Sequence, residues 1–323
     1  MMYNGRYINT SLVCLPPHPL TRRMGWQTTH THMNTITLRK AERKQAKLRI
    51  GLSAPSGAGK TYSALVMAYG MTGDWSKIAL IDTEAGSGEL YAHLGEYNTI
   101  RLDAPYSPER YIEAIRACED AGIDVIIIDS TSHEWEGEGG CLQINENLAN
   151  AKFRGNTWSA WSETTPRHQR FIQAIIQSKA HIITATRNKI DTIMTEDKKV
   201  KKVGTKEIQR EGFEYELTVN FNIDRDTHKV LASKDRTNLF EGLDPFIITH
   251  DTGKKLMEWA TSGAPVPFIE KAVTKQDIRN YLATTYRNLP TTEYGTFITT
   301  ATDLDPNTEE PAKVLQALKD LVK

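Results

Sequence analysis

Short apolar segments alternate with amphipathic segments from Leu48 onward. The apolar segments have the length of buried strands, and the amphipathic ones repeat their apolar positions with the period of a helix. The expected strands are 48–53, 77–82, 125–129 and 181–186, and the expected helices are 60–71, 108–121 and 158–178. This alternation predicts an α/β fold in which a mostly parallel sheet is covered on both faces by helices.

The pattern changes near Phe213, where every second residue up to Ile223 is apolar. A period of two is typical of a half-buried strand, so we expect an antiparallel extension of the sheet, paired with residues 229–233. After the Gly-Ala-Pro-Val-Pro run at 263–267 the chain becomes helical again, over 269–287 and 311–322. This predicts a hinge followed by a small helical appendage.

The first 35 residues lack apolar periodicity and are rich in Thr, His, Asn and Pro, which is typical of an unfolded leader. Met33 directly precedes the first patterned segment, and we expect translation to start there. The predicted organisation is a disordered basic leader over 1–45, a core over 46–245, and a linker with a helical C-terminal region over 246–323.

Composition narrows the class of protein. The 323 residues contain 40 basic and 40 acidic side chains, so any binding to nucleic acid must use local basic patches. The three cysteines, Cys14, Cys118 and Cys141, form no C-x-x-C pair, and the sequence predicts neither a disulfide framework nor a zinc cluster. The longest aliphatic run is 125–128, far short of a membrane span. We expect a soluble, cytoplasmic protein.

A phosphate-binding loop is predicted between the first strand and the first helix, at residues 54–61, Ala-Pro-Ser-Gly-Ala-Gly-Lys-Thr. Glycines let backbone N–H groups surround a phosphate, Lys60 reaches the β and γ oxygens, and the Thr61 hydroxyl binds Mg²⁺. Ala54 replaces the first glycine of the strict pattern, a change between small residues. The candidate nucleotide-binding residues are Ser56, Gly57, Ala58, Gly59, Lys60, Thr61 and Tyr62.

Two acidic residues follow predicted strands. Asp129 ends the strand 125–128, where a water-mediated contact with Mg²⁺ is needed, so Thr61 and Asp129 are the candidate metal ligands. Glu84 follows the strand 77–82, a position from which it could activate the attacking water. We expect Glu84 and Lys60 to be catalytic.

The segments 77–84 and 90–92, together with Ile128-Asp129-Ser130, resemble the catalytic-Glu and Walker B segments of RecA-family recombinases. The run from Leu48 to Phe240 is similar to phage RecA-like ATPases that include the Sak-type single-strand annealing proteins. The resemblance implies a RecA-like P-loop NTPase core, the cofactors ATP and Mg²⁺, and assembly into a ring or filament. It further implies single-stranded DNA as a partner, a possible single-strand-binding protein, and a site of action in the bacterial host cell.

Two features depart from recombinases or extend the likeness. The strand 181–186 offers Thr184 and Thr186 in place of the Asn-Gln pair that senses the γ-phosphate. Lys234 and Arg236 resemble a Lys-x-Arg element that reaches a neighbouring subunit's ATP, which would make hydrolysis depend on assembly; the alternative is a solvated turn.

Two segments are candidate DNA-binding surfaces. The first is a basic run in the loop expected after the fourth strand, consisting of Lys198, Lys199, Lys201, Lys202 and Lys206. The second is the stretch after Asp129, whose aromatic residues among basic ones suit base stacking; it carries Trp135, Phe153, Arg154, Trp158, Trp161, Arg167, His168 and Arg170. We interpret Trp158 and Trp161 as core residues of a helix. His133 and Glu134 have no third metal ligand at a suitable spacing, so we expect a local structural role for them.

Other functions use the same loop. Asn188-Lys189-Ile190-Asp191 spells the guanine-specificity motif of GTPases, but no D-x-x-G follows Asp82 or Asp129. The loop is also close to that of guanylate kinases, but the arginine-rich lid of a nucleotide kinase is missing. A third alternative is a nucleotide-gated DNA-binding protein with little turnover, which would keep annealing after mutation of Glu84.

Overall fold

The computed structural model describes residues 38, 40–194, 200–265, 274–286 and 289–322. Side chains are described over these residues except at 190–194 and 200–205. Most of the predicted leader lies outside the described residues. No helix in this described part of the chain is long and apolar enough to cross a membrane.

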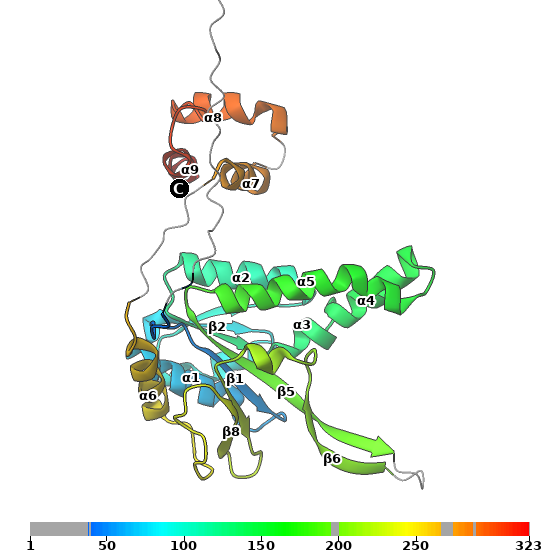
Figure 1. Cartoon of the computed structure of the whole chain (residues 1–323). Coiled ribbons are helices and arrows are strands. Elements are labelled where there is room, and N and C mark those ends of the chain that lie inside the picture. The colour runs from blue at the N-terminus through cyan, green and yellow to red at the C-terminus, as the bar shows by residue number, and fades with distance from the viewer. Residues whose placement is uncertain (1–37, 39, 195–199, 266–273, 287–288, 323) are drawn as a thin grey trace, which may run out of the picture. The chain divides into compact units, whose positions relative to one another are not determined.

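A mixed sheet of eight strands forms the centre of the described core, in the order β3-β2-β4-β5-β1-β7-β8 with β6 paired to β5 (Figure 1). The strands are β1 (Arg49–Ala54), β2 (Ile78–Asp82), β3 (Asn98–Arg101), β4 (Val125–Asp129), β5 (His181–Met194), β6 (Val200–Glu207), β7 (Val219–Ile223) and β8 (Val230–Asp235). Neighbours from β3 to β7 pair in parallel, whereas β6 and β8 pair antiparallel with β5 and β7. The predicted mostly parallel α/β sheet with an antiparallel extension is confirmed.

Helices cover both faces of this sheet (Figure 1). The helices of the core are α1 (Lys60–Thr72), α2 (Pro108–Asp120), α3 (Ser132–Glu136), α4 (Cys141–Lys152), α5 (Thr157–Gln177) and α6 (His250–Thr261), of which α4 packs mainly on α5. One core cluster joins α1 and α6 to β1 and β7, and the other joins α2 and α5 to β4 and β5. Because β4 is buried along its whole length, its sequence is a nearly continuous apolar run. β1 is also fully buried, but Arg49, Gly51 and Ser53 alternate with its apolar residues.

The predicted strand from Phe213 to Ile223 is only half correct. Phe213–Glu216 is a 3₁₀ helix, η3, and β7 begins at Val219. The partner strand was predicted correctly, since β7 pairs antiparallel with β8. Phe213 and Leu217 are buried, but Tyr215 between them is 66% exposed, so the period of two that predicted a strand does not hold over this turn.

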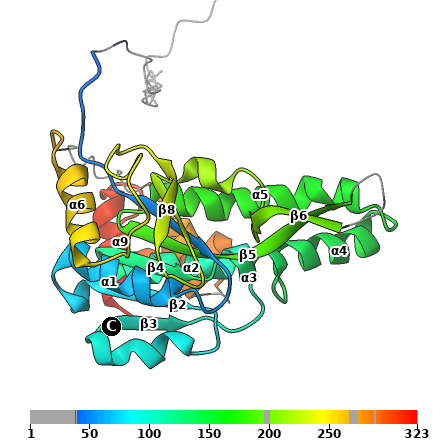
Figure 2. The ribbon, with the colours of Figure 1, turned by 90° about the horizontal axis from the view of Figure 1, so that it is seen from below.

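Several short helices and two strands were not predicted separately. Besides α3 and α4, the chain forms η1 (Trp75–Lys77), η2 (Ser87–Leu94), β3 and β6. The basic run expected in a loop lies largely on β6, which makes a hairpin with an extended β5. In two views this hairpin and the pair α4–α5 project from the sheet in the same direction (Figures 1 and 2).

The C-terminal region contains α7 (Lys275–Thr285), η4 (Thr291–Glu293), α8 (Tyr294–Thr302) and α9 (Pro311–Asp320). Its helices bury a small cluster of their own around Leu282, Ile298 and Leu318. By contrast, α6 packs on α1 within the large core, although it falls in the region that we assigned to the linker. Residues 43–46 bond to the end of α6 and to Ala264.

Glycines allow α6 to approach the helix that follows the phosphate loop. A Cβ atom on Gly253 would lie 2.1 Å from the carbonyl oxygen of Met67. We expect Gly253→Ala to separate α6 from α1 and to lower the free energy of unfolding by about 1–3 kcal/mol. Urea denaturation followed by tryptophan fluorescence measures this. Gly295→Ala is the control, because a Cβ atom there meets nothing within 4 Å; equal midpoints for the two variants would contradict the prediction.

Candidate functional site

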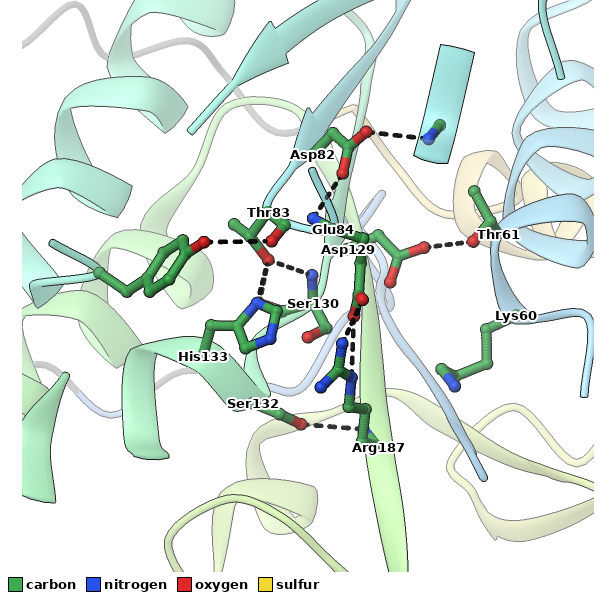
Figure 3. Close-up of polar contacts among 12 residues, drawn as sticks. Lys60, Thr61, Asp82, Thr83, Glu84, Asp129, Ser130, Ser132, His133 and Arg187 are labelled. Atoms are coloured by element: carbon green, nitrogen blue, oxygen red, sulfur yellow. Dashed lines mark hydrogen bonds and ion pairs between the residues drawn. The ribbon is translucent and has the colours of Figure 1, made fainter. Parts of the chain in front are cut away.

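The register of the parallel strands brings the predicted motifs to one edge of the sheet. Asp82 on β2 lies opposite Asp129 on β4, Asp129 lies opposite Ala185 on β5, and Ala54 on β1 lies opposite Arg187. Since parallel strands end at a common edge, the side chains that follow them converge there (Figure 3).

The phosphate loop has the backbone that anion binding requires. Gly57 and Gly59 adopt left-handed conformations, with φ of 79° and 86°, which only glycine adopts without strain. The N-terminus of α1 follows at Lys60, so its unpaired N–H groups and its dipole favour a phosphate. The Lys60 ammonium donates to the carbonyl oxygens of Ala54 and Pro55, at 3.1 and 3.0 Å, and burial lowers its pKa.

Thr61 and Asp129 form the candidate metal site. The Thr61 hydroxyl donates to a carboxylate oxygen of Asp129 at 2.5 Å, and Asp129 is 3% exposed. Burial raises the pKa of Asp129 from 3.8 to about 6, and only the Thr61 hydrogen bond and Lys60 oppose the shift. Mg²⁺ prefers such hard oxygen ligands, and its charge would offset the cost of the buried carboxylate. The residues present therefore fit Mg²⁺.

Glu84 is held in place from two sides. Its backbone N–H donates to Asp82 at 2.6 Å, and that of Gly88 donates to the other oxygen of Asp82 at 2.8 Å. Its carboxylate forms a two-pronged ion pair with Arg187, in which Nε lies 2.9 Å from Oε1 and Nη2 contacts Oε2. The fork of an arginine fixes both oxygens of its partner. Glu84 therefore has a defined orientation beside Lys60 and Asp129 (Figure 3).

Arg187 and His228 are site residues that sequence reasoning missed. Arg187 directly follows the predicted strand 181–186, and a charged residue at the carboxyl end of a parallel strand was a usable signal. His228, in the turn between β7 and β8, lies with Nδ1 3.1 Å from the carbonyl oxygen of Ala58 in the phosphate loop. Nothing in the sequence pattern places this turn over the loop.

The strand-end residues next to Asp129 connect β2, β4 and β5. Thr83 Oγ1 accepts the backbone N–H of Ser130 at 2.8 Å and contacts His133 Nδ1 at 2.8 Å. Thr186 Oγ1 lies 3.0 Å from Thr131 Oγ1, and Thr184 donates to Ile50 at 3.2 Å. The two threonines that we compared with a γ-phosphate sensor thus make contacts inside the sheet.

Lys234 and Arg236 lie away from this edge. Because β8 is antiparallel to β7, Lys234 is level with Asn220, and Asn220 is level with Gly51 near the start of β1. Lys234 donates to the carbonyl of Glu214 at 2.6 Å and Arg236 to that of Tyr215 at 2.7 Å. Within its own chain, the Lys-x-Arg element therefore does not join the phosphate loop, Glu84 and Asp129 at this edge of the sheet.

The two predicted DNA surfaces meet in one cavity of about 860 Å³. Lys198 and Lys199 lie outside the described residues, and the structure places Lys201 and Lys202 on β6 without describing their side chains. The described lining combines aromatic and basic groups, among them Trp135, Trp158, Trp161, Lys189, Lys206 and Arg210. Lys206 also forms an ion pair with Glu211.

The tryptophans of this cavity differ in burial. Trp158 is 85% exposed, so its interpretation as a core residue is wrong. Helix α4 covers the other flank of α5 through Thr164 and Asn145, which leaves Trp158 facing out at the start of α5. Trp161 stacks on Trp135, with 5.5 Å between ring centroids, and the Arg210 guanidinium lies 5.6 Å from the Trp161 ring.

A family model described as an AAA domain matches residues 46–246, which is more than half of the chain. A search of curated proteins finds no match. The family match and the geometry of the phosphate loop together indicate a nucleotide-binding P-loop domain of the ATPase type.

Replacing the buried charge of Asp129 tests the metal site. Without Mg²⁺ or nucleotide, we expect Asp129→Asn to raise the free energy of unfolding at pH 7 by about 2–3 kcal/mol, as the raised pKa of Asp129 implies. The native state keeps the Asp129 proton up to about pH 6, whereas the unfolded chain loses it near 3.8, so wild-type stability falls as pH rises across that window.

Urea denaturation between pH 5 and 8 measures the difference in free energy of unfolding between Asp129→Asn and the wild type. This difference should increase up to about pH 6 and then stay constant. With Mg²⁺ and ATP the wild type should become the more stable of the two proteins, because only its Asp129 carboxylate binds the cation. A stability difference that does not change with pH would contradict the assignment of Asp129 as a buried Mg²⁺ ligand.

Proposed function

The chain belongs to the AAA domain family, and on that premise we propose that it is a RecA-like ATPase acting on single-stranded DNA in phage-type recombination or annealing. The observation that supports hydrolysis best is the convergence of Lys60, Thr61, Glu84 and Asp129 at one sheet edge. A protein that only held a nucleotide with Mg²⁺ would need Asp129 but would not need an oriented Glu84.

In this proposal each residue has one task. The backbone of 56–61 holds the β-phosphate, and Lys60 exchanges the carbonyls of Ala54 and Pro55 for phosphate oxygens. Mg²⁺, when bound at Thr61 and Asp129, would neutralise charge on the phosphates. Glu84 orients the attacking water and accepts its proton.

We assign Arg187 a positioning role, since it grips both oxygens of Glu84 in the absence of nucleotide. Tyr62 is exposed beside the loop, with its ring 6.2 Å from that of Tyr91. These two rings offer an aromatic surface on which the base of the bound nucleotide can stack.

Assembly explains Lys234 and Arg236 better than action within one chain does. Both lie far along β7 and β8 from the edge that carries the phosphate loop, and both are held by carbonyls of 214–215. We propose that in a ring or filament they reach the site of a neighbouring subunit. Hydrolysis would then rise with protein concentration.

The cavity between α5 and β6 supports a single-stranded DNA substrate. Exposed Trp158 and the Trp135–Trp161 stack offer faces for bases, and Lys189 and Arg210 offer charge for phosphates. Base stacking on an aromatic side chain contributes about 1–3 kcal/mol and is tolerant of sequence. An annealing or recombination protein needs this kind of contact.

One observation keeps GTP as a second candidate. Asn188, the first residue of the guanine-type motif, lines a cavity of about 690 Å³ with Pro55 of the phosphate loop and Asn222. Its Oδ1 atom is buried and has no hydrogen-bond partner among the described residues. However, Asn188 and Lys189 lie within strand β5 and pair with β6, unlike a loop that folds over a base.

Hydrolysis is the first test. We expect ATP turnover that single-stranded DNA stimulates, a loss of at least about 100-fold in Glu84→Gln with nucleotide binding retained, and loss of binding in Lys60→Ala. Release of phosphate and binding of a fluorescent ATP analogue measure the two properties. GTP-specific turnover, or turnover indifferent to DNA, would move the function to the Asn188 motif. Annealing that survives in Glu84→Gln would instead indicate a nucleotide-gated binding protein.

DNA binding is tested separately at Trp158. We expect Trp158→Ala to weaken binding of a fluorescent oligothymidine by about 5- to 150-fold at fixed salt, because one stacking face is removed. Trp158→Phe, which keeps an aromatic face, should retain most of the affinity. If both variants bind DNA as the wild type does, the cavity is not the DNA site. That result would leave the test of ATP hydrolysis without DNA unaffected.

A further inference from the structure

Three potential metal ligands lie close together next to Trp135, which lines the cavity between α5 and β6, called here the tryptophan cavity. Glu134 comes from α3, Cys141 begins α4 and His168 lies within α5. Their ligand atoms all lie within 4.8 Å of one another. Cys141 Sγ is 3.1 Å from Glu134 Oε1, and His168 Nδ1 is 3.0 Å from the same oxygen. The spacing of residues in the sequence did not reveal this cluster, because Cys141 and His168 lie 7 and 34 positions after Glu134.

The spacing of these atoms is close to that of a tetrahedral zinc site. Bonds of about 2.0 Å to nitrogen or oxygen and about 2.3 Å to sulfur separate neighbouring ligand atoms by roughly 3.3–3.8 Å. The separations of 3.0 and 3.1 Å from the Glu134 oxygen need to widen by a few tenths of an ångström. The third separation, between the cysteine sulfur and the histidine nitrogen, is at most 4.8 Å and must settle at about 3.5 Å. A ligand set of one thiolate, one imidazole and one carboxylate favours Zn²⁺ over Mg²⁺ or Ca²⁺.

The charge balance of this buried cluster also favours a divalent cation. Glu134 and Cys141 are 0% exposed and His168 is 4% exposed, and burying a carboxylate without a cation is costly. A divalent cation balances one carboxylate and one thiolate while the imidazole stays neutral, so the filled site carries no net charge. Among the described residues, the side chains that contact the Glu134 carboxylate are His168 and Cys141 of the cluster and Gln209, which donates an amide hydrogen bond at 3.4 Å.

We propose that Glu134, Cys141 and His168 bind one Zn²⁺ ion, with water as the fourth ligand. The ion ties α3, α4 and α5 together, directly behind Trp135, whose ring lies edge-on to His168 at 5.4 Å between centroids. Binding displaces the thiol proton of Cys141 to solvent, because burial and Glu134 hold the pKa of that thiol well above its usual range. This site is distinct from the Mg²⁺ site and does not depend on ATP hydrolysis.

The test uses the full chain, purified without a metal-affinity tag, stripped with a chelator and reloaded with Zn²⁺ or Co²⁺. We expect about one zinc per chain by mass spectrometry, and a higher thermal midpoint than in the stripped protein. Co²⁺ should give a thiolate charge-transfer band in the near ultraviolet. Cys141→Ser should lose this band and bind zinc at least about tenfold more weakly, and His168→Gln should show the same loss of affinity.

Cys118→Ser is the matched control, since Cys118 is also a buried free thiol but is not part of the ligand cluster. It should keep both the zinc and the Co²⁺ band. Zinc content equal in wild type and Cys141→Ser would overturn the proposal, as would wild-type protein that takes up Co²⁺ without a thiolate band. The band is measured on the unaltered chain, so it decides the matter even if the variants fail to fold.

Discussion

The parallel register of β2, β4, β5 and β1 is the constraint on which the site depends. It aligns Asp82 with Asp129 and Ala54 with Arg187, so four separate turns meet at one edge. A slip of one residue in any of these strands would turn its terminal side chain to the opposite face. The register is fixed because β1, β2 and β4 are buried on both faces, where every apolar side chain has a fitted partner.

Electrostatics at this edge are balanced in pairs. Lys60 rests on loop carbonyls, Asp129 on Thr61, and Glu84 on Arg187. Each pair satisfies a buried or half-buried group that would otherwise be costly in the absence of a ligand. An incoming triphosphate can replace the loop carbonyls at Lys60, and its cation can bind between Thr61 and Asp129, while Arg187 keeps Glu84 in place. Without the cation, the buried Asp129 charge still lowers the stability of the free protein, as its raised pKa shows.

The segment after Asp129 connects this edge to the tryptophan cavity. Thr131 and Ser132 bond to β5, the Ser132 hydroxyl accepting the backbone N–H of Arg187 at 2.8 Å. Glu134 and Trp135 follow within one short helix, and they contact His168 and Trp161 of α5. A shift of Arg187 with Glu84 would reach the cavity through only a few side chains. Under the proposed function, these contacts would connect the nucleotide site to the DNA site.

The sequence by itself determined the parallel core strands β1, β2, β4 and β5 with helices α1, α2 and α5, the phosphate loop, Glu84 after β2 and Asp129 at the end of β4, since these depend on local periodicity and on residues adjacent in the chain. Only the tertiary structure decided the contacts of Arg187 and His228, the outward position of Trp158 and the meeting of Glu134, Cys141 and His168. It also separated Lys234 and Arg236 from the phosphate edge. These depend on strand register, strand direction and helix packing, which bring together residues from distant parts of the chain, and a pattern of neighbouring residues carries no information about them.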